Sequence, residues 1–149
     1  MLSSNGRYGL KALICLARAP EGEIAQVANI AARNNISKKF LDAILLDLRS
    51  AGFVRSRKGP GGGYMLAKPA TEIMIGDVVR EIDGPLAPIA CNNRSAYSAC
   101  PDCIDPDLCG VRMVMYEVRD AIADILDHTT LASLAERGRS RELVWDYAI

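Results

Sequence analysis

One feature of this sequence constrains its fold more than any other, a change of hydrophobic period at Gly52. Before this glycine, apolar side chains recur every three or four positions, as they do on amphipathic helices. After it, the period falls to two for a few residues on either side of a glycine-rich loop, as it does in a β-hairpin. The chain therefore has to combine a small bundle of helices with a two-stranded hairpin.

The elements expected from these periods are short. Helices are expected over residues 4–19, 24–31, 38–50 and 73–82, and strands over residues 53–58 and 64–68. Ser37 is a good N-cap for the third helix, whose inward face is expected to carry Phe40, Leu41, Ile44, Leu45 and Leu48. Two short helices joined by a brief turn and followed by a hairpin are typical of a winged helix-turn-helix.

The remaining sequence divides into a loop and a helix. Periodicity disappears between Pro85 and Leu108, and a structureless segment of this length is usually functional or disordered. A strong amphipathic stripe follows, made by Val111, Val114, Met115, Val118, Ile122, Ile125 and Leu126. A short tail helix around Leu131 to Ala135 and a polar segment come next. We expect a mostly α-helical fold with a small β-hairpin wing and a long additional helix.

Charged side chains are divided unequally along the chain. Eighteen basic and eighteen acidic residues give the 149-residue chain a formal net charge of zero. Residues 1–68 hold eleven Lys or Arg against four Asp or Glu, a net +7, whereas residues 69–149 carry a net −7. This division favours contact between the first half alone and a polyanion. No apolar run approaches the ~20 residues that span a bilayer and no signal-peptide pattern is present, so a cytoplasmic protein is expected.

Basic side chains stand where a winged helix-turn-helix meets DNA. Such a module inserts the N-terminal turn of its second helix into the major groove, and here that turn is Ser37, Lys38 and Lys39. Two lysines at a helix start conflict with the helix dipole, and a bound phosphate would remove the conflict. A solvated lysine pair is the alternative interpretation, and the hairpin that follows favours DNA contact over it.

The expected wing repeats this pattern. Arg55, Arg57 and Lys58 follow one another along its first strand, and Gly61 and Gly62 allow the backbone to approach a sugar-phosphate surface closely. A simple tight turn is the alternative. A nucleotide-binding P-loop is disfavoured, because no Gly-Lys-Ser/Thr follows and no βαβ unit surrounds the loop.

Four strings of the sequence resemble a known family. They are residues 5–13 (NGRYGLKAL), 30–37 (IAARNNIS), 57–66 (RKGPGGGYML) and 75–79 (IGDVV). Over about residues 1–130 the chain resembles the IscR/NsrR/RirA-type (Rrf2) family of winged helix-turn-helix bacterial transcription regulators. The resemblance implies a DNA-binding domain that includes Arg7 and Tyr8, a long helix exchanged between two subunits, and in many members an iron–sulfur cluster in the preceding loop.

The expected organisation has four parts. They are a winged helix-turn-helix domain over 1–83, a cysteine-rich cluster-binding loop over 84–108, a dimerisation helix and short tail helix over 109–136, and a polar C-terminal tail over 137–149. The stripe from Val111 to Leu126 is more apolar than a lone surface helix needs, which also favours a homodimer. A two-fold dimer sets its recognition helices about 34–36 Å apart, matching a palindromic operator on double-stranded DNA.

Four of the five cysteines fall within nineteen residues, at Cys91, Cys100, Cys103 and Cys109. Thiolates are soft ligands that suit iron–sulfur clusters and also zinc. By the resemblance, Cys91, Cys103 and Cys109 match a three-cysteine pattern, with Cys100 either an extra thiol or the second ligand in place of Cys103. All four are candidate metal ligands for an iron–sulfur cluster of the 2Fe-2S or 4Fe-4S type. Cys15 stands in an apolar stretch and is expected to be a buried cysteine.

Several functions remain open for these cysteines. Structural zinc usually needs two closely spaced pairs, and a reversible dithiol switch between Cys100 and Cys103 is a further alternative. A thiol oxidoreductase is disfavoured, because the βαβ context of such enzymes is missing, and no catalytic set is evident. We therefore expect no enzyme but a DNA-binding regulator, a repressor by expectation, modulated by a cluster that senses iron, redox state or nitric oxide. A cluster-free regulator that senses redox state through thiols is the alternative.

Overall fold

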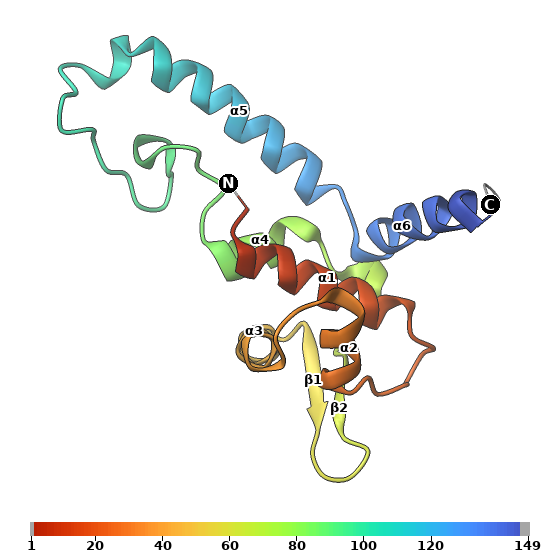
Figure 1. The fold of residues 1–149 in the computed structure, drawn as a ribbon. Coiled ribbons are helices and arrows are strands. Elements are labelled where there is room, and N and C mark those ends of the chain that lie inside the picture. The colour runs from red at the N-terminus through yellow and green to blue at the C-terminus, as the bar shows by residue number, and fades with distance from the viewer. Residues whose placement is uncertain (1, 147–149) are drawn as a thin grey trace.

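A computed structural model describes the backbone of residues 2–146 and the side chains of residues 2–139. Its helices are α1 (Ser4–Arg18), α2 (Val27–Asn34), α3 (Lys38–Ser50), α4 (Ile75–Asp83), α5 (Gly110–Asp127) and α6 (Leu131–Asp146). Its strands are β1 (Val54–Arg57) and β2 (Gly63–Leu66), which pair antiparallel. Figure 1 shows a helical body with the hairpin projecting from one side and α5 extending from the other. The predicted fold, mostly helical with one small hairpin, is confirmed.

The hydrophobic core joins α1, α3, α4 and the base of the hairpin. Leu13, Ile30, Leu41, Leu45, Leu48, Ile73 and Val78 are all completely buried. Phe40, which the periodicity placed on the inward face of α3, is instead 42% exposed, so that prediction was wrong. The reason is that Phe40 lies in the first turn, at the edge of the bundle, where its ring packs edge-on against Tyr8 with the centroids 5.8 Å apart.

The beginning of α2 also differs from the prediction. The helix was expected to start at residue 24, but it starts at Val27, because Ala25 is drawn into an isolated bridge with Tyr64 of β2. Their backbone N–H groups each donate to the other residue's carbonyl oxygen at 2.9 Å. A Cβ atom at Gly63 would lie 2.2 Å from the Ala25 carbonyl oxygen. Glycine at this position therefore lets the wing lie against the helix-turn-helix.

The two ends of α5 are attached differently. At its C-terminal end, Arg80 of α4 donates two hydrogen bonds to Asp127, at 2.6 and 2.8 Å, and the Ile75 N–H donates to the Thr129 carbonyl at 2.9 Å. Its N-terminal end extends away from the body and carries the irregular segment that leads back to α4 (Figure 1). The long helix therefore connects α4 to the segment that holds the cysteines, and its C-terminal end is held by these hydrogen bonds.

Helix α6 is longer than the short tail helix that was predicted. Its first turns pack on the body, with Leu131 completely buried and Ala135 nearly so. The helix nevertheless continues to Asp146 through residues with adequate helix propensity. Positions 147–149 of the predicted polar tail lie outside the described residues. Within the described part of the chain, no helix is both long and apolar enough to cross a membrane.

Candidate nucleic-acid interface and cysteine loop

A groove of about 440 Å³ between α2, α3 and the wing gathers basic side chains. Lys38 of α3 and Arg57 and Lys58 of the wing line it together, although the two segments are well separated in the sequence. Gly61 and Gly62 of the wing loop line the same groove. The fold thus brings five of the predicted DNA-binding residues to one concave surface, which we call the basic groove.

The first turn of α3 is positively charged and exposed. Ser37 caps the helix by accepting a hydrogen bond from the Phe40 N–H at 3.4 Å, and no acidic residue occupies the first turn. Lys39 is exposed, and Lys38 forms an exposed ion pair with Asp42 at 3.0 Å. Such surface pairs are worth a few tenths of a kcal/mol, so Lys38 can exchange Asp42 for a phosphate at little cost (~0.3–0.5 kcal/mol). This helix start is suited to bind an anion.

The two wing arginines have different surroundings. Arg57 pairs in register with Gly63 and lines the basic groove. Arg55 pairs with Met65, and its Nε donates to the Met65 sulfur at 2.9 Å. Arg55 lines a separate hollow next to the turn between α1 and α2. The structure therefore does not bring Arg55 into the groove that holds Lys38 and Arg57.

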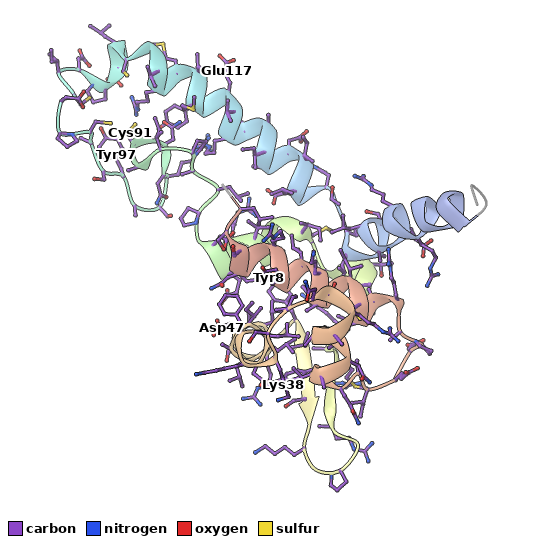
Figure 2. All side chains as sticks on the ribbon, viewed as in Figure 1. Tyr8, Lys38, Asp47, Cys91, Tyr97 and Glu117 are labelled. Carbon is purple, nitrogen blue, oxygen red and sulfur yellow. The ribbon has the colours of Figure 1, made fainter. Side chains whose placement is uncertain are left out.

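Arg7 and Tyr8 of α1 lie beside the start of α3. The Arg7 guanidinium lies 5.1 Å from the centroid of the Tyr8 ring, and its Nη2 donates to the Tyr8 hydroxyl at 3.4 Å. Figure 2 shows Tyr8 on the side of α1 that is turned toward α3. Through the edge-on contact with Phe40, the Arg7–Tyr8 pair is joined to the exposed first turn of α3.

The sequence analysis missed several polar residues of the basic groove, among them Gln26, Arg49 and Ser56. Gln26 precedes α2 and Arg49 lies in the last turn of α3, and both line the groove. The Arg49 Nη1 also donates to the Ser56 hydroxyl at 3.1 Å, which ties the end of α3 to the wing. Nothing local distinguishes these residues from other exposed polar residues. Only the folding of the wing against α3 places them here.

The opposite faces of α5 have different environments. One face carries an exposed apolar stripe at heptad-like spacing, with Val111 65%, Val114 54%, Val118 38% and Ile125 63% exposed. The other face carries Arg112, Tyr116 and Arg119, which are at most partly exposed and hold the cysteine segment. The amphipathic stripe predicted for this helix is therefore mostly turned away from the chain's own core.

Residues 84–109 between α4 and α5 contain the four clustered cysteines and two single 3₁₀ turns, Ala90–Asn92 and Pro106–Leu108. Cys91 is 4% exposed, and its carbonyl oxygen accepts a hydrogen bond from the Tyr116 hydroxyl at 3.4 Å. The neighbouring Asn92 carbonyl accepts one from Arg119 Nη1 at 3.2 Å. The first cysteine is thus fixed against the middle of α5 (Figure 2).

The last cysteine of the loop is fixed at the start of the same helix. The Cys109 sulfur accepts a hydrogen bond from the Arg112 backbone N–H at 3.5 Å and so caps α5. The Arg112 side chain donates to the Pro106 carbonyl at 2.9 Å and to the Tyr116 hydroxyl at 3.2 Å. Since Tyr116 also contacts the Cys91 segment, Arg112 and Tyr116 link the two ends of the cysteine loop.

The thiols of this loop lie within electrostatic reach of one another. The adjacent Cys91 is the main cause that raises the pKa of Cys100, through charge repulsion and a thiol hydrogen bond. Partial burial is the main cause that raises the pKa of Cys103, and Cys109 and Cys100 add to it. All five cysteines of the chain fall in the described part and are free thiols. Removing several protons here would place repelling thiolates side by side.

This donor set fits a thiolate-ligated metal or cluster in its chemistry, because four thiols, which are soft donors, share one loop. The geometry is not that of a closed site. Over residues 2–139, no group of three or more His, Cys, Asp or Glu side chains is positioned to hold a metal ion. Cys15 lies in α1 among residues packed on the core, remote from the loop in sequence and partly buried.

Comparison with known proteins identifies the relatives of this chain. Residues 2–137 match the family profile named Rrf2 and described as an iron-dependent transcriptional regulator. An rrf2-like HTH-type transcriptional regulator of Rhodobacter capsulatus is 41% identical over 141 residues, which cover 93% of this chain and 94% of that protein.

Two solved structures extend the comparison to the fold. The structure titled as CymR, the global cysteine regulator of B. subtilis, has a TM-score of 0.76 and 34% identity, covering 92% of this chain and 97% of that one. The structure of T. potens IscR has a TM-score of 0.72 and 28% identity, covering 93% of this chain and 88% of that one. Both matches therefore cover more than nine tenths of this chain.

Proposed function

This chain belongs to the Rrf2 family of DNA-binding transcription regulators, and we propose that an iron–sulfur cluster held by its cysteine loop modulates its binding to an operator. One observation carries the proposal. Cys91 and Cys109, the two ends of the loop, are both fixed on one face of α5 by Tyr116 and Arg112. A bound cluster would therefore act on the helix that is joined to the DNA-binding domain at Arg80 and Asp127.

The repulsion among the thiols supports the same proposal. Cys100 and Cys103 have raised pKa values because neighbouring thiols and partial burial disfavour their charged forms. The ferric and sulfide core of a cluster would supply positive charge to stabilise the thiolates, and ligation would order an irregular loop. Cys91, Cys103 and Cys109 are the proposed ligands, with Cys100 as the fourth candidate.

DNA binding is assigned to the basic groove and its surroundings. We propose that Ser37, Lys38 and Lys39 enter the major groove, and that Arg57, Lys58, Gly61 and Gly62 contact the sugar-phosphate backbone from the wing. Arg7 and Tyr8 would contact the backbone beside the start of α3. Arg55 is the weakest member of the predicted set, because its guanidinium group is engaged with Met65 outside the groove.

A second copy of this chain is the proposed occupant of the exposed stripe on α5. A single chain leaves Val111, Val114, Val118 and Ile125 in solvent along one face of the helix. Pairing two such helices would bury these side chains and set two recognition helices on one DNA molecule. The relatives are named as transcription regulators, which bind DNA and are not enzymes.

A thiol-based switch is the second candidate function, favoured by the proximity of Cys100 to Cys91. In that case hydrogen peroxide would be the oxidant. The two thiols would give up two electrons and two protons and form a disulfide, and the peroxide would take up both and be reduced to two water molecules. The name of one structural relative, the global cysteine regulator, makes sulfur chemistry a reasonable context for this alternative.

Anaerobic purification tests the cluster directly. We expect visible absorbance together with stoichiometric iron and acid-labile sulfide, lost in Cys91→Ala, Cys103→Ala and Cys109→Ala. Cys15→Ala is the matched control, since this thiol lies in α1 and should leave the iron content unchanged. Iron and sulfide missing even after anaerobic reconstitution would contradict the proposal. A Cys91–Cys100 disulfide found by mass spectrometry after peroxide treatment of that iron-free protein would favour the thiol switch.

A further inference from the structure

A polar cavity of about 540 Å³ lies where α4, α5 and the segment after α4 meet. Its volume falls within the roughly 300–1,000 Å³ of ordinary small-molecule sites. Arg80 of α4, Asn92 of the cysteine loop and Arg119 of α5 all line it, so three separate parts of the chain converge there. None of the proposed DNA contacts and none of the cysteines is part of its lining.

The cavity wall contains a buried donor without a partner. Asn92 is completely buried, and its side-chain Nδ2 makes no hydrogen bond among the described residues. A buried amide N–H without an acceptor costs about 1–3 kcal/mol, so an unused donor at a cavity wall indicates a missing acceptor. The Asn92 backbone carbonyl is already engaged by Arg119, which fixes the position of the residue.

Guanidinium groups outnumber carboxylates in this cavity. Arg80 donates two hydrogen bonds to Asp127 and also lies 3.7 Å from Asp77, which is outside the lining. Arg119 and Arg94 share the single carboxylate of Asp120, with Arg119 Nε at 3.0 Å from its Oδ1 and Arg94 Nη2 at 4.0 Å. Arg119 is only 7% exposed, so its charge is largely removed from water. The lining itself therefore carries three guanidinium groups and two carboxylates, and Arg94, at 77% exposure, is the guanidinium most open to a ligand.

From this arrangement we propose that the cavity binds a small organic carboxylate with a short apolar group. The carboxylate oxygens would accept hydrogen bonds from Arg94 and from the unpartnered Asn92 amide. The ligand would add a negative charge to a lining in which guanidinium groups outnumber carboxylates. Pro85, Leu86 and Ala123 of the same lining would contact the apolar part. The inference rests on the cavity alone and does not depend on a cluster in the loop.

The cavity lies on a different side of α5 from the exposed apolar stripe. Arg119 and Ala123 are separated from Val111, Val118 and Ile125 by roughly a quarter turn or more of the helix, at 100° per residue. Pairing of two chains along the stripe would therefore leave the cavity lining uncovered by the partner's helix. A carboxylate bound between Asn92, Arg94 and Arg119 would also contact the first turn of the cysteine loop, since Asn92 belongs to Ala90–Asn92.

Calorimetric titration of the whole chain with sodium butyrate and sodium benzoate, at constant ionic strength, tests the inference. We expect saturable binding at millimolar concentration, weakened about tenfold in Arg94→Ala because one charge-assisted hydrogen bond is removed. Arg94→Lys should recover part of the affinity. Arg94 is 77% exposed, so neither substitution should affect folding, which thermal unfolding will verify. Arg137→Ala, an exposed arginine of α6 outside the cavity, is the matched control and should bind normally.

A second measurement locates the bound probe. The ¹H–¹⁵N resonances of the Asn92 side-chain amide should shift on saturation with benzoate, because this group gains an acceptor. The inference is overturned if neither carboxylate gives saturable heat and the Asn92 amide stays unshifted. It is equally overturned if Arg94→Ala binds as tightly as the unsubstituted chain, or if inorganic phosphate binds in preference to both carboxylates.

Discussion

At the scale of single residues, the chemistry of the proposed DNA face depends on two lysines at the beginning of α3. A helix start normally favours acidic residues, yet Lys38 and Lys39 occupy this turn and no carboxylate does. Among residues 2–139, Lys38 forms its ion pair with Asp42, and this contact is exposed. A phosphate is the partner that would satisfy both the ammonium groups and the free N–H groups of the turn.

Substituting these lysines should weaken DNA binding in a salt-dependent way. In Lys38→Ala and in Lys39→Ala, we expect lower operator affinity. In a plot of the logarithm of the binding constant against the logarithm of the salt concentration, the slope should become shallower by about 0.9 for each phosphate that the variant no longer neutralises. Fluorescence anisotropy over a range of salt concentrations measures both quantities. Lys11→Ala, an exposed lysine of α1 outside the site, serves as the control. Unchanged affinity and slope in both α3 variants would show that this helix does not enter the groove.

At the scale of elements, α5 holds the cysteine loop on one face and leaves an apolar stripe exposed on another. Arg112, Tyr116 and Arg119 bind the cysteine loop, while the valines at positions 111, 114 and 118 remain exposed. Fully burying an exposed valine is worth about 1.5–3 kcal/mol. These valines are 38–65% exposed, so in the proposed two-fold dimer each would contribute a part of that value in each subunit. A single chain therefore covers one face of α5 and leaves the apolar stripe on the other face in solvent.

Charge on the exposed stripe should separate the proposed dimer. For Val114→Glu combined with Val118→Glu, we expect a monomer at micromolar concentration, because four carboxylates would be brought into an apolar interface. Sedimentation velocity distinguishes the two states. Glu117→Gln is the control, since Glu117 lies on α5 outside the stripe and is exposed (Figure 2). A doubly substituted chain that sediments like the original would show that the subunits meet elsewhere.

At the scale of the whole molecule, the link between Arg80 and Asp127 joins the DNA-binding domain to the helix that carries the cysteine loop. The hydrogen bonds from Arg80 are the main cause that lowers the pKa of Asp127. A carboxylate whose pKa is lower in the folded state stabilises the fold fully above its unfolded pKa of about 4. That contribution disappears as the pH falls through the lower folded value.

Removing this carboxylate should therefore change how the free energy of unfolding depends on pH in the acidic range. For Asp127→Asn, we expect a lower free energy of unfolding at neutral pH and a weaker loss of stability between about pH 5 and pH 2. Urea unfolding at a series of pH values measures both. Glu81→Gln, an exposed acidic residue of α4, is the control. If Asp127→Asn followed the same pH profile as the original chain, the link would contribute no stability.

Most helices and the hairpin of this molecule could be predicted from the sequence, because the sequence signals for these elements are local. Helical period, the Ser37 cap and the glycine-rich turn each act over a few residues, so they determined α1, α3, the wing and the position of the long helix. The same locality made the charge of the α3 start and the clustering of the four cysteines visible before any fold was known.

Other features were decided only by tertiary contacts between distant segments. Pairing of Ala25 with Tyr64 delayed the start of α2, and the edge of the bundle left Phe40 beside Tyr8 instead of in the core. An amphipathic pattern shows that a helix has an apolar face, but it does not show what covers that face. The sequence therefore could not show that the apolar stripe of α5 stays exposed within one chain, or that Arg112 and Arg119 hold the cysteine loop. The cavity beside Asn92 likewise exists only because three segments, each ordinary by itself, converge in the folded chain.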